Sequence, residues 1–266
     1  MKTRIISAII ALAICLPILF LGGTIYKLGI YILSIISLHE FLELKQTKKE
    51  MPSFINFISY LILTLLVLSN INTTTILFKL DFRIISGLFL VFLLPTVLYQ
   101  DNTKYSIADA FFFIGSLVFI GASFSLLILI RNISLNLIIY LFVITIFTDT
   151  YALLVGKLIG KHKMVEKISP NKTWEGMIGG TFFGVVAGVL FYNTVIDNSF
   201  NILTLIGITL FLSIIGQYGD LVFSTIKRYF GKKDFSNIMP GHGGILDRLD
   251  SIIFVVLSFT FFIGIL

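Results

Sequence analysis

The chain has 266 residues, of which 57% are hydrophobic and only 13% are charged, and its formal net charge is +6. A soluble globular domain carries about 25% charged residues, so this composition, with a mean hydropathy of +1.00, excludes that class. The single cysteine, Cys15, excludes both a disulfide framework and a cysteine metal cage.

Apolar runs that could cross about 30 Å of hydrocarbon recur along the whole chain. They predict nine membrane spans, near 5–22, 26–42, 54–69, 83–99, 107–130, 134–156, 176–194, 202–226 and 251–266. The predicted fold is therefore all-α, a polytopic integral membrane protein. Residues 1–133 are expected to form lipid-facing scaffold helices and residues 134–266 the helices that carry the functional site, within one integral domain.

The distribution of basic residues predicts the orientation of these spans. With the N-terminus in the cytoplasm, sixteen of the twenty Lys and Arg residues fall in cytoplasmic segments. Such an excess is the usual mark of the cytoplasmic side. The positive charge is therefore expected to face anionic lipid headgroups or phosphates at the inner surface.

The acidic residues of the first half of the chain give a weaker signal. Glu40 and Glu43 lie beside His39 at the end of the second predicted span, and Asp109 lies near the start of the fifth. The favoured interpretation is that they are interfacial side chains that reach water. The alternative is a supporting role in the site, for which Asp109 is the better candidate because small residues around it suggest close helix packing.

The sixth span carries one acid on a face of small residues. In a helix, Asp149, Ala152, Gly156 and Gly160 fall near one stripe, which another helix or a ligand could approach. Charged groups inside a membrane bundle are usually functional. The alternative is a structural acid capped by Thr150.

A polar loop precedes the seventh span, with the sequence Ser169-Pro170-Asn171-Lys172-Thr173-Trp174-Glu175-Gly176. Thr173 or Asn171 can cap the following helix, and free amides at a helix start beside Lys172 form an anion site. An ordinary capped loop remains an equal or better explanation of this segment taken by itself.

The strongest signal is a polar island from Gly219 to Asp250 in this apolar chain. Asp220, Ser224 and Lys227 recur at i, i+4 and i+7, which places an acid, a hydroxyl and a base on one helix face. Arg228 and Lys233 continue a basic segment that suits a phosphate. A solvated juxtamembrane loop is the alternative, but acids on two successive helices argue against it.

The island ends in a flexible turn followed by paired acids. Pro240-Gly241-His242-Gly243-Gly244 has little side-chain bulk, so its backbone can approach a ligand. Asp247 and Asp250 then project from one face of the next helix, with Arg248 between them. Oxygen ligands beside phosphate-binding bases suit Mg²⁺ and do not suit zinc.

These motifs resemble those of the phosphatidate cytidylyltransferase (CDP-diacylglycerol synthase) family. The match is made by Ser224, Lys227-Arg228, Lys233-Asp234, His242-Gly243-Gly244 and Asp247-Arg248-Leu249-Asp250, all at the family's spacing. Gly219-Asp220, the loop from Ser169 to Gly176 and Asp149-Thr150 are also similar, although Tyr151 stands where relatives often carry a small residue. The similarity is specific over about 149–250, and the first half matches only in hydrophobicity and span number.

The resemblance implies transfer of a cytidylyl group from CTP to phosphatidic acid, giving CDP-diacylglycerol and pyrophosphate. The residues expected to be catalytic are Asp220, Ser224, Lys227, Arg228, His242, Asp247 and Arg248. Those expected to bind substrate are Ser169, Lys172, Thr173, Lys233, Gly243 and Gly244. Asp220 and Asp247 are the first choices as metal ligands, followed by Asp250 and Asp149. One or two divalent ions, Mg²⁺ in the first place, are expected, and a monovalent ion is an alternative for the second.

The expected partners are CTP, phosphatidic acid and membrane lipids, without nucleic acid, and a homodimer is left open. The expected location is the cell (plasma) membrane, with the site on the cytoplasmic side. A lipid or nucleotide transporter is the main rival class, although no inverted repeat is visible. A CTP-dependent lipid or polyprenol kinase is the nearer alternative, and a CDP-alcohol phosphotransferase is disfavoured because its Asp-rich motif is absent.

Overall fold

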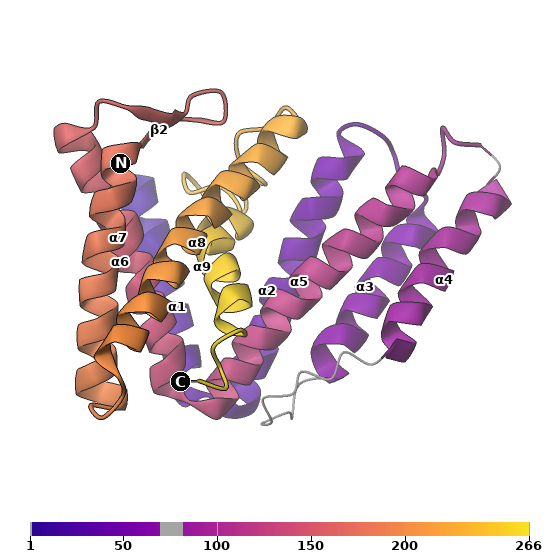
Figure 1. The fold of residues 1–266 in the computed structure, drawn as a ribbon. Helices are drawn as coiled ribbons and strands as arrows, with labels where there is room; N and C mark the ends of the chain where they lie inside the picture. The colour runs from indigo at the N-terminus through magenta and orange to yellow at the C-terminus, as the bar shows by residue number, and fades with distance from the viewer. Residues whose placement is uncertain (1, 70–81, 100, 266) are drawn as a thin grey trace. The chain divides into compact units, whose positions relative to one another are not determined.

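The computed structural model describes residues 2–69, 82–99 and 101–265. Its elements, drawn in Figure 1, are α1 (Lys2–Leu21), α2 (Gly23–Gln46), α3 (Ser53–Ser69), α4 (Phe82–Tyr99), α5 (Ile107–Ile133), α6 (Leu135–Ile159), β1 (Lys163–Val165), β2 (Ser169–Thr173), α7 (Trp174–Phe191), a π-helical turn η1 (Tyr192–Ile196), α8 (Ile202–Tyr229) and α9 (Leu246–Phe259). The prediction of an almost wholly helical chain is confirmed.

Five helices of the described residues are long and apolar enough to cross a membrane. They are Gly23–Gln46, Ile107–Ile133, Leu135–Ile159, Trp174–Ile196 and Ile202–Tyr229. Three shorter apolar helices fall within α1, α3 and α4. Each predicted span coincides with a helix, but α9 has only 14 residues, and Leu266, the end of the ninth predicted span, lies outside the described residues. The chain is thus a membrane-embedded helical protein, and nine spans stay a prediction.

The chain divides into two compact units, which are described separately. The N-terminal unit comprises Met1–Asn132 and Asp234–Leu246, and the C-terminal unit comprises Ile133–Lys233 and Asp247–Leu266. The break at Leu246 falls between the first and second residues of α9, so this helix continues the chain from one unit into the other.

In the N-terminal unit, aromatic side chains join helices that are far apart in sequence. Phe41 of α2 lies 6.4 Å from Phe112 of α5 and 5.5 Å from Phe235, between ring centroids. Phe92 of α4 stacks on Phe113 of α5 at 5.6 Å. Burial of the apolar surface of these rings stabilises the packing of α2 and α4 against α5.

In the C-terminal unit, a row of glycines on α7 brings the backbones of α6 and α7 together (Figure 1). Gly176, Gly180, Gly184 and Gly188 recur at every fourth position and are all buried. A Cβ on Gly180 would lie 2.6 Å from the Thr148 carbonyl oxygen of α6. Only glycine therefore permits this close approach, as in other small-residue interfaces of membrane helices.

The segment between α6 and α7 is a small hairpin, whereas the sequence predicts a loop there. Strands β1 and β2 pair antiparallel, with Lys163 opposite Thr173 and Val165 opposite Ser169. Thr173 then caps α7 as predicted, because its hydroxyl accepts a hydrogen bond from the Gly176 amide at 3.1 Å. The hairpin fixes the entry of the chain into α7.

Candidate active site

The polar end of α8 carries the predicted acid, hydroxyl and base on one face. The Ser224 hydroxyl donates to Asp220 Oδ1 at 3.3 Å. Asp220 Oδ2 also forms an ion pair with Lys172 Nζ at 2.6 Å. Lys172 lies on β2, so the structure brings the predicted substrate-binding lysine to the acid–base face of α8. Lys172 Nζ donates in addition to the Gln217 carbonyl oxygen at 3.3 Å, which fixes its direction.

The base of this face is held by the first turn of α9. Lys227 Nζ lies 2.6 Å from Asp247 Oδ1, and the two side chains are only 10% and 4% exposed. Because both side chains are nearly excluded from water, removing either one would leave the other charge buried and unpaired, at a large cost in folding free energy. The motif residues Lys227 and Asp247 thus form one buried ion pair.

The remaining acids lie close to this pair. Asp149, Asp220 and Asp250 are near enough for their negative charges to act on one another. Asp250 also interacts with Lys227, and Asp149 with Lys172. Asp149 is exposed on α6, while Asp220 and Asp250 are half-buried. We call Asp149, Lys172, Asp220, Lys227, Asp247 and Asp250 the acid–lysine cluster.

This cluster contains four carboxyl and two amino side chains, so its formal charge with all six groups ionised is an excess of two negative charges. Within the described residues, no three His, Cys, Asp or Glu side chains are already gathered at the spacing of a metal site. The arrangement therefore offers hard oxygen donors and surplus negative charge, with two of its acids engaged by lysines.

Two other predicted site residues of the C-terminal unit, Arg228 and Thr173, have hydrogen-bond partners of their own. Arg228 donates to the Lys232 carbonyl oxygen at 2.9 Å and to that of Ile168 at 3.3 Å, so it links α8 to the hairpin. Lys233 and Arg248 are exposed, and Ser169 is half-buried in β2. Thr173, predicted to bind substrate, is buried and uses its hydroxyl as the α7 cap.

The glycine-rich turn of the motif belongs to the N-terminal unit. Gly241 and Gly243 have φ of 78° and 85°, which side chains rarely adopt, and the Gly243 and Met239 backbones form a bridge. His242 Nδ1 lies 2.7 Å from the Ser7 hydroxyl of α1. The catalytic role of His242 and substrate binding by Gly243 and Gly244 stay predictions.

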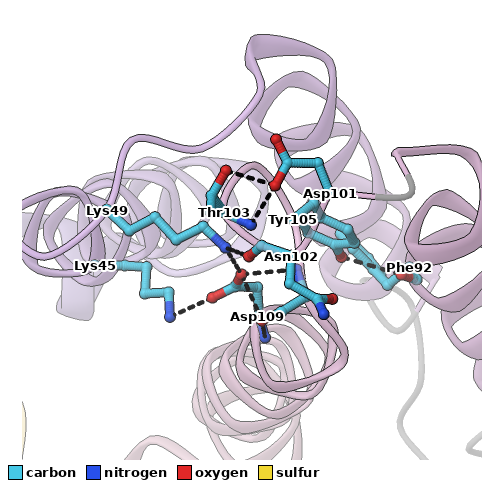
Figure 2. A network of polar contacts seen from close by, with 9 residues as sticks. Lys45, Lys49, Phe92, Asp101, Asn102, Thr103, Tyr105 and Asp109 are labelled. Carbon is cyan, nitrogen blue, oxygen red and sulfur yellow. Dashed lines mark hydrogen bonds and ion pairs between the residues drawn. The ribbon is translucent and has the colours of Figure 1, made fainter.

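Two acids expected to reach water are instead buried. Glu40 is fully buried and Asp109 is 2% exposed. Figure 2 shows both Lys45 and Lys49 directed at Asp109, with Lys45 Nζ 2.6 Å from Oδ1 and Lys49 paired with Oδ2. The Ser106 amide and hydroxyl donate to the same carboxylate at 2.9 and 2.8 Å. Because Lys45 lies on α2 and Lys49 lies three residues after its end, Asp109 ties the end of α2 to α5 within the N-terminal unit.

The same network fixes the turn before α5. Lys49 Nζ also donates to the Asn102 carbonyl oxygen at 2.8 Å, so this one lysine joins the segment after α2 to both the turn and α5. Within the turn, hydrogen bonds from the Thr103 hydroxyl and amide lower the pKa of the exposed Asp101 carboxyl (Figure 2). These contacts give Asp109 a structural role. The sequence alone could not distinguish this role from that of an acid that reaches water at the membrane interface.

Two groups of residues near the cluster are absent from the sequence-based prediction. Ser251 hydrogen bonds to Asp149 and so ties α9 to α6. The four buried glycines of α7 set the distance between α6 and α7. The glycine spacing was a visible signal, because small residues four apart mark a helix interface. Nothing in the sequence marks Ser251 as the partner of Asp149.

Comparison with known proteins extends the similarity beyond the motif. A family model described as "Cytidylyltransferase family" matches residues 2–266. Phosphatidate cytidylyltransferases of Staphylococcus haemolyticus and Staphylococcus aureus strain COL are 39% and 41% identical to this chain, each over 96% of both chains. The expectation that only 149–250 is specifically similar is therefore wrong, since the match includes the N-terminal helices. The chain belongs to the cytidylyltransferase family.

Proposed function

We propose that this protein transfers the cytidylyl group of CTP to phosphatidic acid, giving CDP-diacylglycerol and pyrophosphate. The observation that carries the proposal is the acid–lysine cluster, in which Lys172 pairs with Asp220 and Lys227 with Asp247. The proposal is supported by relatives named phosphatidate cytidylyltransferase, which are 39% and 41% identical to this chain over 96% of both chains.

In this reaction a phosphate oxygen of phosphatidic acid attacks the α-phosphorus of CTP. The new phosphorus–oxygen bond forms as the bond to the bridging oxygen of the β-phosphate breaks, and pyrophosphate departs with that electron pair. The attacking phosphate is already ionised near neutral pH, so no strong general base is needed. The difficulty is the approach of two polyanions, which positioned positive charge relieves.

Lys172 and Lys227 are the residues proposed to supply that charge. Each ammonium is held at 2.6 Å by one carboxylate, so its position is fixed before substrate arrives. Preorganised charge of this kind avoids the cost of rearrangement during the reaction. Arg228, Lys233 and Arg248 are proposed to bind phosphate oxygens, Ser224 to donate to one, and His242 to donate to the departing pyrophosphate.

The donor set fits a hard divalent cation such as Mg²⁺. Its ligands would be carboxylate oxygens, and the six groups of the cluster carry two surplus negative charges by formal count, which a divalent cation would balance. Asp149, Asp220, Asp247 and Asp250 would hold the ion or ions, as the sequence predicts. When bound, such a cation would neutralise phosphate charge near the lysines.

We further propose that the acid–lysine cluster lies on the cytoplasmic side of the cell membrane, with the N-terminus in the cytoplasm. This orientation is supported by the sixteen of twenty basic residues that it assigns to cytoplasmic segments. CTP would then enter from the cytoplasm, while phosphatidic acid reaches the site from the bilayer with its acyl chains remaining in lipid.

The direct test incubates purified protein with phosphatidic acid, Mg²⁺ and CTP labelled in its cytidine. Label in lipid together with pyrophosphate release is expected. Release of CDP with unlabelled, phosphorylated lipid would instead indicate a kinase, and no lipid label with any phosphate acceptor would refute the proposal. Asp247→Asn should abolish transfer, whereas Asp197→Asn, which changes an exposed acid between η1 and α8, should retain it.

A further inference from the structure

Glu40 is a fully buried carboxylate on α2, and it accepts hydrogen bonds from the segment that leads into α9. Its Oε1 accepts from the Ser236 hydroxyl at 2.6 Å and from the Ile245 amide at 2.8 Å. Its Oε2 accepts from the Leu246 amide at 2.8 Å. All these residues belong to the N-terminal unit, and they lie about 200 positions from Glu40 in the sequence.

These contacts make Glu40 a cap for α9 supplied by a distant helix. Leu246 is the first residue of α9, and the amides at a helix start have no partner within the helix. A carboxylate there satisfies those donors and interacts favourably with the positive end of the helix dipole. Burying the carboxylate is tolerable for the same reason, because both oxygens are hydrogen bonded.

The glycine-rich turn is built around this carboxylate. A Cβ on Gly244 would collide with the Glu40 side chain. The preceding Gly243 has φ of 85°. From the sequence alone, the small residues of this turn are explained by the approach of a ligand. At Gly244 the structure gives a different reason, because the group that approaches the backbone is the Glu40 carboxylate.

We propose that Glu40 is a positioning residue for cytidylyl transfer, acting through the start of α9. Asp247, which pairs with Lys227 at 2.6 Å, is the next residue after Leu246. By fixing the amides of Ile245 and Leu246, Glu40 sets where α9 begins and hence where the Asp247 carboxylate is presented. The inference rests on the proposed function for its activity readout and adds a residue from outside the motif.

The test compares Glu40→Gln with Glu43→Gln, an exposed acid one turn later on the same helix. In Glu40→Gln an amide NH₂ replaces one acceptor oxygen, so a donor faces a backbone amide and a hydrogen bond to the helix start is lost. We expect kcat to fall at least tenfold while KM for CTP changes less than threefold. Amide hydrogen exchange over 236–250 should accelerate about tenfold, with exchange in α5 unchanged. Glu43→Gln should match wild type in all three measurements.

The outcomes separate this inference from the proposed function. Lack of lipid labelling by the wild-type protein would refute the function, whereas the exchange measurement still tests the cap. With an active wild type, a Glu40→Gln rate within twofold of Glu43→Gln overturns the positioning role, as does faster exchange in all helices. If Glu40→Gln does not fold, Ser236→Ala removes the hydrogen bond to Glu40, together with the one that the hydroxyl accepts from the Ile238 amide. It should lower kcat about fivefold, and an unchanged kcat overturns the inference.

Discussion

Removing Lys227 should destabilise this protein more than removing its partner Asp247. The pair is nearly excluded from water, with side-chain exposures of 10% and 4%, and its atoms lie 2.6 Å apart. Deleting one member of such a pair costs about 3–5 kcal/mol, because the other charge is left buried. The two deletions differ in what surrounds the charge that remains.

Lys227→Met increases the formal excess of negative charge in the acid–lysine cluster from two to three. Asp247→Asn reduces it to one and leaves Lys227 beside Asp250, which already interacts with it. We therefore expect about 4 kcal/mol of destabilisation for Lys227→Met and about 2 kcal/mol for Asp247→Asn. The double variant should lose about 2 kcal/mol instead of the sum, because replacing both charges leaves neither unpaired.

Thermal unfolding in detergent micelles without divalent cations measures these differences. At about 2–4 °C per kcal/mol, Tm should fall by about 12 °C for Lys227→Met and about 6 °C for Asp247→Asn and for the double variant. Lys232→Met, an exposed lysine nearby, is the control and should shift Tm by less than about 2 °C. Equal losses for the two single variants, or an additive double variant, would refute the charge argument.

Three further predictions concern the metal, the glycine interface and the Asp109 network. Mg²⁺ at about a hundred times its Kd should stabilise the wild-type protein by about 2.7 kcal/mol without nucleotide, and Asp250→Asn should lose most of that gain in a Tm titration; an unchanged gain would exclude Asp250 as a ligand. Gly180→Val should cost about 3 kcal/mol by overpacking α6 against α7, whereas Gly207→Ala, where a Cβ meets open space, should be neutral or stabilising in the same Tm assay. Asp109→Asn should cost about 2 kcal/mol, since its lysines are 16% and 22% exposed, while the transfer rate per folded molecule stays within twofold of wild type; a larger rate loss would assign Asp109 to the site.

The sequence predicted those features of the fold that depend on local pattern. Apolar runs located eight of the nine helices of the described residues within a few positions, because the cost of exposing backbone to lipid makes long apolar segments helical. The ninth predicted span, 251–266, is displaced from α9, which begins at Leu246 and ends at Phe259. Helical periodicity placed Asp220, Ser224 and Lys227 on one face, and in the structure the Ser224 hydroxyl donates a hydrogen bond to Asp220. The hairpin from Lys163 to Thr173 was not predicted, since its pairing uses backbone groups in a short polar segment.

Periodicity indicates which face of a helix is polar, but it does not indicate which other segment that face meets. The sequence by itself therefore determined the membrane class, the helices, the motif and the resemblance to a family. The tertiary structure decided that Lys172 reaches Asp220, that Asp247 holds Lys227 and that Glu40 caps α9. The physical reason is that a buried charge must find its partner among whichever segments pack beside it, and that packing is set by shape and area over the whole unit.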